Sequence, residues 1–178
     1  DFYQYYYTSS GQLAWDNTKY LNIWIGDAAD TGILGQALLP VIPLQENDGL
    51  AISYKAFGVG GATVGANRKG RTATHEIGHY LGLFHPWGDG GCSFGDGVAD
   101  TPETYDSYSG CPTFPSNQYA CVASTNGSMF MNYMDYVNDA CMAFFTLGQK
   151  EIMRNTLAGP RLSLLSSNGC GTLGLNEY

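Results

Sequence analysis

The sequence predicts one domain of the α+β class, with its strands early in the chain and its helices later. Three segments rich in aromatic or β-branched residues, at 1–7, 20–25 and 49–58, predict strands. Helical patterns follow at 71–83 and 146–158. At 178 residues the chain is long enough to bury a hydrophobic core within a single domain.

The predicted strands are DFYQYYY, YLNIWI and GLAISYKAFG, the last with a glycine at either end. We interpret the tyrosine cluster of the first as a strand that packs aromatic rings on both faces, in preference to a binding role. Several glycines follow the third strand, but a phosphate-binding loop would need a Gly-Lys-Ser/Thr ending, which is absent. We therefore interpret that run as a mobile loop.

The two predicted helices have recognisable ends. In the first, Gly82 can take the left-handed conformation that commonly ends a helix. The second, TLGQKEIMRNTLAGP, has Thr146 and Gln149 spaced for a capping box and Gly159-Pro160 as a stop. Residues 88–130 between them are rich in Gly, Pro, Ser, Thr and Asn. Such a long loop needs support, for which disulfide bonds and a bound ion are the obvious candidates.

The charge balance excludes several classes of function. Eight Lys and Arg against sixteen Asp and Glu give a formal net charge of −8, which argues against nucleic acid and against an anionic membrane surface. No apolar run approaches the roughly 18 residues of a membrane-spanning helix. The chain begins with Asp1 and no signal-peptide pattern, so we expect that a leader or pro-segment has been removed.

Five cysteines, at 92, 111, 121, 141 and 170, match no tight zinc-binding spacing. Four of them bracket the loop-rich segment. We interpret these four as two disulfide bonds and expect an oxidising, extracellular compartment, with reduced buried thiols as the alternative. Four cysteines allow three pairings. Cys170 is the odd one, either free or paired outside the chain.

All three histidines lie in HEIGHYLGLFH, residues 75–85. Positions i and i+4 share one face of a helix, so His75 and His79 can direct their imidazoles to one point, as zinc requires at a Zn–N distance of roughly 2 Å. Glu76 is turned by about 100° from His75, which suits a base acting on a metal-bound water. After the glycine turn, His85 can supply a third nitrogen. The fourth position then stays open for water, as in catalytic zinc sites.

This extended motif resembles that of the metzincin clan of zinc endopeptidases, which also have a methionine-containing turn beneath the metal. Together with DTP at 100–102 and NYMDYVNDACM, it resembles the pappalysin family in particular, over roughly residues 20–158. The resemblance implies a mixed twisted sheet and an active-site helix in an upper lobe, about 1–82. A loop-rich lower lobe with a C-terminal helix, about 83–178, would follow. The family's usual opening strand and backing helix are not both present, so we expect a separate N-terminal fragment, a cleavage or an abridged fold.

The resemblance also assigns roles to single residues. The three histidines would bind Zn²⁺, and Glu76 would act first as general base and then as general acid. Met134 would be the methionine of the turn, a role that hardly differs from that of an ordinary core methionine. Tyr136 matches a tyrosine that stabilises the oxyanion in several metzincins, and a buried structural tyrosine is the alternative.

The implied function is that of a secreted zinc endopeptidase acting on proteins or peptides. A zinc-bound water would attack the scissile carbonyl while Glu76 accepts its proton. We expect the substrate to extend along a sheet edge near residues 50–57. The alternatives are a catalytically inactive zinc-binding interaction domain, against which the intact Glu76 and Tyr136 argue, and a structural or adhesive domain.

The resemblance further points to the disulfide bonds Cys92–Cys121 and Cys111–Cys141, an interleaved pattern that would tie the long loop to the region of the methionine turn.

A calcium site is expected in GDGVADTPET, which offers hard oxygen donors on a glycine-rich turn. Relatives in the family carry calcium in this loop. We expect Asp96, Thr101 and a carbonyl near Ala99 to bind a structural Ca²⁺, with merely solvated acids as the alternative.

The segment DYVNDACM would line the pocket for the residue just after the scissile bond, as in metzincins. Backbone amides are expected to hold Asp135, as is common for Asp in turns. Asp139 would then favour Lys or Arg in that pocket, and Arg more because of its bidentate geometry. The alternative is a hydrophobic pocket, with Asp139 solvated or bound to calcium.

Overall fold

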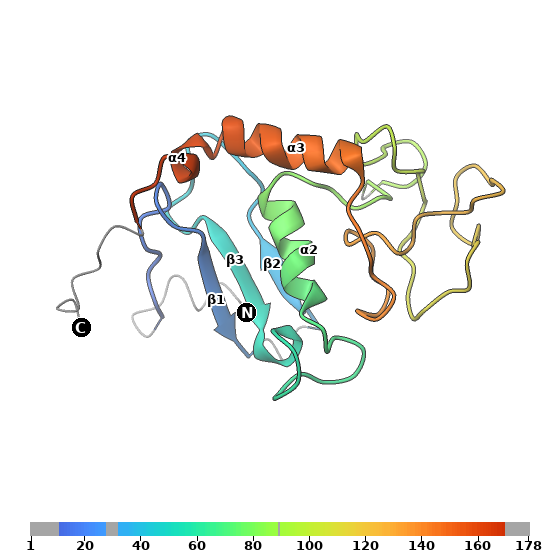
Figure 1. Ribbon diagram of the computed structural model, residues 1–178, viewed down its shortest axis with the longest axis horizontal. Coiled ribbons are helices and arrows are strands. Elements are labelled where there is room, and N and C mark those ends of the chain that lie inside the picture. Colours follow the sequence, from blue (N-terminus) through green and yellow to red (C-terminus); the bar gives the residue numbers. More distant parts are fainter. Residues whose placement is uncertain (1–10, 28–31, 89, 170–178) are drawn as a thin grey trace.

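The computed structural model describes residues 11–27, 32–88 and 90–169 (Figure 1). Its sheet contains β1 (Asn22–Gly26), β2 (Gly35–Ala37) and β3 (Gly49–Ser53), in the order β1-β3-β2. β1 runs parallel to β3 and β2 runs antiparallel to it. α2 (Arg71–Tyr80) packs against β2 and β3, which confirms the α+β class. The strand predicted at 1–7 lies outside the described residues.

The central strand, β3, confirms the first half of the strand predicted at 49–58. All five of its residues are buried. Leu50 and Ile52 form a core cluster with Tyr80 of α2. After Ser53 the chain turns into a short 3₁₀ helix, η1 (Tyr54–Ala56), so the predicted strand is too long.

The edge strand next to α2 is β2, which the sequence did not indicate because it has only three residues and no alternating pattern. It pairs with β3 from Gly35↔Ile52 to Ala37↔Leu50. β3 therefore has a neighbour on each side, and the expectation that substrate adds to the strand near 50–57 is wrong. The main chain of β3 already bonds to β1 and β2 and cannot accept another strand.

α2 confirms the predicted helix, although it ends at Tyr80 instead of residue 83. Gly82, with φ +92°, donates its N–H to the carbonyl of His79 (2.8 Å), and Leu83 donates to that of Gly78 (3.0 Å). This pair of bonds is a Schellman motif, which stops the helix and turns the chain toward His85.

The segment between α2 and α3 (Leu147–Ala158) has neither a helix nor a strand among its described residues. Disulfide bonds join Cys92 to Cys121 and Cys111 to Cys141, the pairs that the resemblance implies. A small core of Tyr108, Phe130 and Val137 lies within this segment. Cross-links and a local core thus support the long loop, as its length required.

α3 has the predicted capping box between Thr146 and Gln149. It is followed by α4 (Leu162–Leu165), which returns to the sheet side of the molecule (Figure 1). Just before α4, Arg161 is fully buried, pairs with Asp48 and donates from Nε to the carbonyl of Tyr80 (2.8 Å). The chain after α3 therefore packs against the sheet and α2, and the division into two lobes stays a prediction.

Candidate active site

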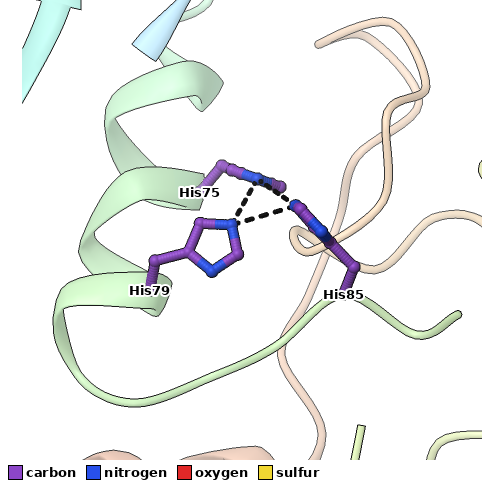
Figure 2. Close-up of side chains that lie close together, drawn as sticks. All are labelled: His75, His79 and His85. Carbon is purple, nitrogen blue, oxygen red and sulfur yellow. Dashed lines mark hydrogen bonds between the residues drawn. The ribbon is translucent and has the colours of Figure 1, made fainter. Parts of the chain in front are cut away.

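The three histidines of the motif converge at the end of α2 (Figure 2). The Nε2 atom of His79 lies 3.0 Å from that of His75 and 3.0 Å from that of His85, and the third separation is 3.3 Å. His75 and His79 come from one face of α2, whereas His85 is delivered by the turn at Gly82. The spacing of the motif therefore brings three imidazole nitrogens to one point, as predicted.

Hydrogen bonds to backbone carbonyls orient the first two rings. Nδ1 of His75 lies 2.7 Å from the carbonyl oxygen of Tyr133, and Nδ1 of His79 lies 2.8 Å from that of Leu83. A carbonyl only accepts, so each Nδ1 carries the proton and each Nε2 turns a lone pair inward. Burial, followed by the neighbouring histidines, lowers the pKa of His75 to about 3, which keeps this ring neutral.

This arrangement fits a zinc ion. Ligands at a Zn–N distance of 2.0–2.1 Å in tetrahedral geometry are separated by about 3.3 Å, close to the distances found here. Lone pairs that face one another repel unless a cation lies between them. The three histidines are also the only group of three or more His, Cys, Asp or Glu residues within the described ranges that could hold a metal ion.

Glu76 lies beside this centre in a buried position, and burial raises the pKa of its carboxyl to about 8. Its carboxylate faces Gly35 of β2. A Cβ built on Gly35 would lie 2.5 Å from Oε1 and 2.8 Å from Cδ of Glu76. A glycine at this point of the edge strand therefore leaves the space that the carboxylate occupies.

The methionine turn packs directly beneath the helix. Met134 is fully buried, and a Cβ on Gly78 of α2 would collide with its sulfur atom. Asn132 holds the turn, because its Oδ1 accepts the N–H of Met134 (2.9 Å) and its amide exchanges two hydrogen bonds with that of Gln149. The capping-box glutamine of α3 thus also fixes the turn under the site, a link that no pattern in the sequence indicates.

Tyr136, two residues after the methionine of the turn, also contacts the histidines. Its hydroxyl lies 3.0 Å from Nε2 of His85, and the residue is 52% exposed, so it is not the buried structural tyrosine of the alternative interpretation. Trp87 contacts both of these rings and is a site residue that sequence reasoning missed. The only indication of this role in the sequence is that Trp87 stands two positions after the last histidine of the motif.

Comparison with known proteins agrees with this geometry. A sequence model of the peptidase family described as pregnancy-associated plasma protein-A matches residues 6–158. The chain belongs to this pappalysin family. Similar relatives include an extracellular metalloprotease of Sordaria macrospora, 39% identical over 145 residues, and one of Arthroderma benhamiae, 41% identical over 134 residues. These alignments cover 76% and 72% of this chain and 47% of each relative, so the chain spans about half their length.

Solved structures show the same metzincin fold. Mature mirolysin of Tannerella forsythia in complex with a cleaved peptide is 46% identical, with a TM-score of 0.79 over 86% of this chain and 59% of that one. A promirolysin variant of the same organism is 45% identical, with a TM-score of 0.79 over 86% of this chain and 52% of that chain.

Within the described residues, no helix of this pappalysin-family chain has the length and apolar character needed to cross a membrane.

A cleft of about 600 Å³ runs past the histidines, Glu76 and Tyr136. β2 forms one side of it, and the segment after the methionine turn, including Asp135 and Asp139, forms the other. Oδ1 of Asp135 accepts the N–H groups of Tyr108 (2.8 Å) and Tyr136 (2.7 Å), so backbone amides hold this carboxylate as expected.

Asp139 lies in the wall of the cleft and is only 2% exposed. Its Oδ2 accepts the N–H groups of Lys69 (2.7 Å) and Arg71 (3.2 Å) at the start of α2. Gly70, the N-cap residue of α2, has no side chain to perform this role. Asp139 therefore caps the N-terminus of α2, although it lies 68 positions after Arg71 in the chain. The sequence did not suggest this role.

The loop expected to bind calcium is compact around Thr101. The Thr101 hydroxyl lies 2.7 and 2.8 Å from the two carboxylate oxygens of Asp96 and 2.8 Å from the carbonyl of Val98. The sequence predicted a carbonyl near Ala99, and the carbonyl found here belongs to the residue just before it. Asp100 instead accepts the N–H of Gly148 at the start of α3.

Proposed function

We propose that this chain is the catalytic part of a secreted zinc-dependent endopeptidase. The observation that supports this proposal is the convergence of three imidazole lone pairs beside a buried carboxylate, at the wall of an open cleft. The cleft can accept an extended peptide along β2. The extracellular metalloproteases among the relatives support the same reading, as do the two disulfide bonds.

His75, His79 and His85 would hold the zinc ion. When bound there, zinc lowers the pKa of a water molecule and polarises the scissile carbonyl. Glu76 accepts the proton of the attacking water and passes it to the leaving amine. The Tyr136 hydroxyl donates a hydrogen bond to the developing oxyanion, for which its exposed position beside His85 is suited.

We also propose that the residue just after the scissile bond is preferably Arg or Lys. Asp139 supports this preference because both of its hydrogen bonds to α2 end on Oδ2, and a carboxylate can accept further bonds at its second oxygen. Arginine would match this geometry best. Val137 and Met142 line the same cleft, so a purely apolar pocket is the competing outcome.

A structural Ca²⁺ at Asp96 and Thr101, with a carbonyl of residues 98–99, is part of the proposal. Three oxygen atoms surround Oγ1 of Thr101, the two carboxylate oxygens of Asp96 and the carbonyl oxygen of Val98. The hydroxyl has one proton and cannot donate a full hydrogen bond to all three. Clustered oxygen atoms of this kind suit a hard cation. Because a promirolysin is among the similar structures, we further propose that a pro-segment accompanies this domain in its precursor.

Digestion of a denatured protein by the zinc-loaded chain tests the function. Glu76→Gln should abolish cleavage while zinc stays bound, and a chelator should abolish it reversibly. If the zinc-loaded wild type leaves the protein intact, the chain is instead a non-catalytic zinc-binding interaction domain.

A further inference from the structure

The two ends of the cleft differ in charge, because Asp139 lies in the wall of one end, where the exposed Ile33 and Leu34 before β2 also line the cleft. At this end, Asp139 accepts the N–H groups of Lys69, just before α2, and of Arg71, its first residue, so its carboxylate marks the start of that helix. At the other end two apolar side chains, Leu39 and Phe84, line the same cleft and are 36% and 46% exposed.

Leu39 and Phe84 both lie near the C-terminal end of α2, because the chain after β2 meets the turn that ends that helix. A Cβ built on Gly82 would lie 3.5 Å from Cγ of Pro40, which shows how closely the two segments approach. Leu39 precedes Pro40 and Phe84 follows Gly82 by two residues. The catalytic centre lies between this apolar end and the acidic end, because His75 and Glu76 lie in the middle of α2 and His79 in its last turn. His85 follows after the turn at Gly82.

The direction of the strands decides which end meets which part of a substrate. β2 is antiparallel to β3, and α2 also runs back against the direction of β3, so β2 and α2 point the same way (Figure 1). Gly35, Gln36 and Ala37 all border the cleft, and β2 is the edge strand of the described sheet. A peptide that pairs with β2 in the antiparallel sense, the more stable one, enters at the apolar end and leaves at the acidic end.

We infer that the cleft selects an apolar side chain among the three residues that precede the scissile bond, through contacts with Leu39 and Phe84. This inference rests on the proposed peptidase function. The two exposed side chains lose contact with water when such a residue covers them, which favours Leu, Ile, Val, Met or Phe at that position. The complete preference is then an apolar residue before the bond and a basic residue after it.

Sequencing of the products of a peptide-library digest by the zinc-loaded protein tests the inference. We expect apolar residues to be enriched within three positions before the cleaved bond. A pair of peptides that differ only by Leu or Ala at the enriched position should differ about tenfold in kcat/KM. In Phe84→Ser and Leu39→Ser this ratio should fall toward one, while the preference after the bond is unchanged.

Leu162→Ser is the matched control, because Leu162 is 55% exposed on α4 and does not line the cleft, so the tenfold ratio should persist. Cleavage without apolar enrichment before the bond would overturn the inference alone. Apolar residues after the bond and basic residues before it would show that the peptide runs in the opposite direction, which also overturns it. Absence of any cleavage by the wild type would contradict the proposed function and the inference together.

Discussion

The indole of Trp87 lies flat against the imidazole of His85, with ring centroids 4.3 Å apart and planes inclined by 8°. The same indole meets the ring of Tyr136 edge-on at 5.0 Å. Backbone carbonyls orient His75 and His79, and this stack adds an aromatic wall to the third ligand. Trp87 therefore limits how both the His85 and the Tyr136 rings can turn.

Replacing Trp87 should weaken zinc binding. We expect Trp87→Ala to raise the zinc dissociation constant about tenfold, as is typical when a group that orients a metal ligand is lost. Trp87→Phe keeps a flat ring and should retain most of the affinity. Competition with a chelator of known affinity measures the effect, and Trp15→Phe, an exposed tryptophan packed on Tyr20, is the control. Equal zinc affinity in Trp87→Ala and wild type would contradict the prediction.

Gly35→Ala should separate zinc binding from catalysis. The new methyl group would lie 2.5 Å from Oε1 of Glu76 and must displace the carboxylate. We expect kcat/KM to fall by about 100-fold or more, within the range for losing a positioned general base. Zinc content, measured by elemental analysis, should stay at one ion per chain. A variant with full activity would show that Glu76 can move without cost.

The stability of the zinc-free protein should depend on pH through Asp135. Burial raises the pKa of this carboxyl to about 7 from its usual 3.8. The folded state therefore keeps a proton that the unfolded chain releases, so this contribution to stability falls as pH rises from about 4 to about 7. Asp135→Asn cannot ionise and keeps an oxygen for the N–H groups of Tyr108 and Tyr136.

We expect the variant to gain stability relative to wild type by ~1–4 kcal/mol between pH 4 and pH 8, at ~1.4 kcal/mol per pKa unit. Urea unfolding of both proteins in chelator at the two pH values provides the measurement. If the two proteins differ in unfolding free energy by the same amount at pH 4 and at pH 8, the pKa of Asp135 is not raised.

The buried pair of Arg161 and Asp48 should be the most sensitive ion pair described. Arg161 is fully buried, its guanidinium lies 3.4 Å from the centroid of the Tyr80 ring, and it also donates to the carbonyl of Leu38. Arg161→Met leaves the Asp48 carboxylate buried without its cation and should cost about 3–5 kcal/mol of unfolding free energy.

The exposed pair of Lys19 and Asp16 provides the control for Arg161→Met. Lys19→Met should change stability by less than about 1 kcal/mol. Similar losses in both variants, measured by urea unfolding, would contradict the importance of the buried pair.

Removal of calcium should lower thermal stability even when zinc is saturating. The ion would hold the loop around Thr101 against α3, where Asp100 already bonds to Gly148. We expect a lower melting temperature on calcium depletion in wild type, and no response to calcium in Asp96→Asn. An unchanged melting temperature in the wild type would exclude a structural calcium ion here.

Local patterns in the sequence predicted α2, the convergence of the three histidines and the capping box of α3. Each of these depends on residues within about ten positions of one another, so helical periodicity and turn chemistry are enough to predict them. The α+β class followed in the same way from strand and helix patterns.

Only the tertiary structure decided which strand borders the cleft and which distant groups complete the site. β2 is too short to have a pattern, and it is an edge because of how the chain pairs, not because of its own residues. Asp139 caps α2, Gln149 fixes the methionine turn and Arg161 joins the chain after α3 to the sheet across 113 residues. Such contacts depend on the packing of elements far apart in the chain, which local periodicity does not encode.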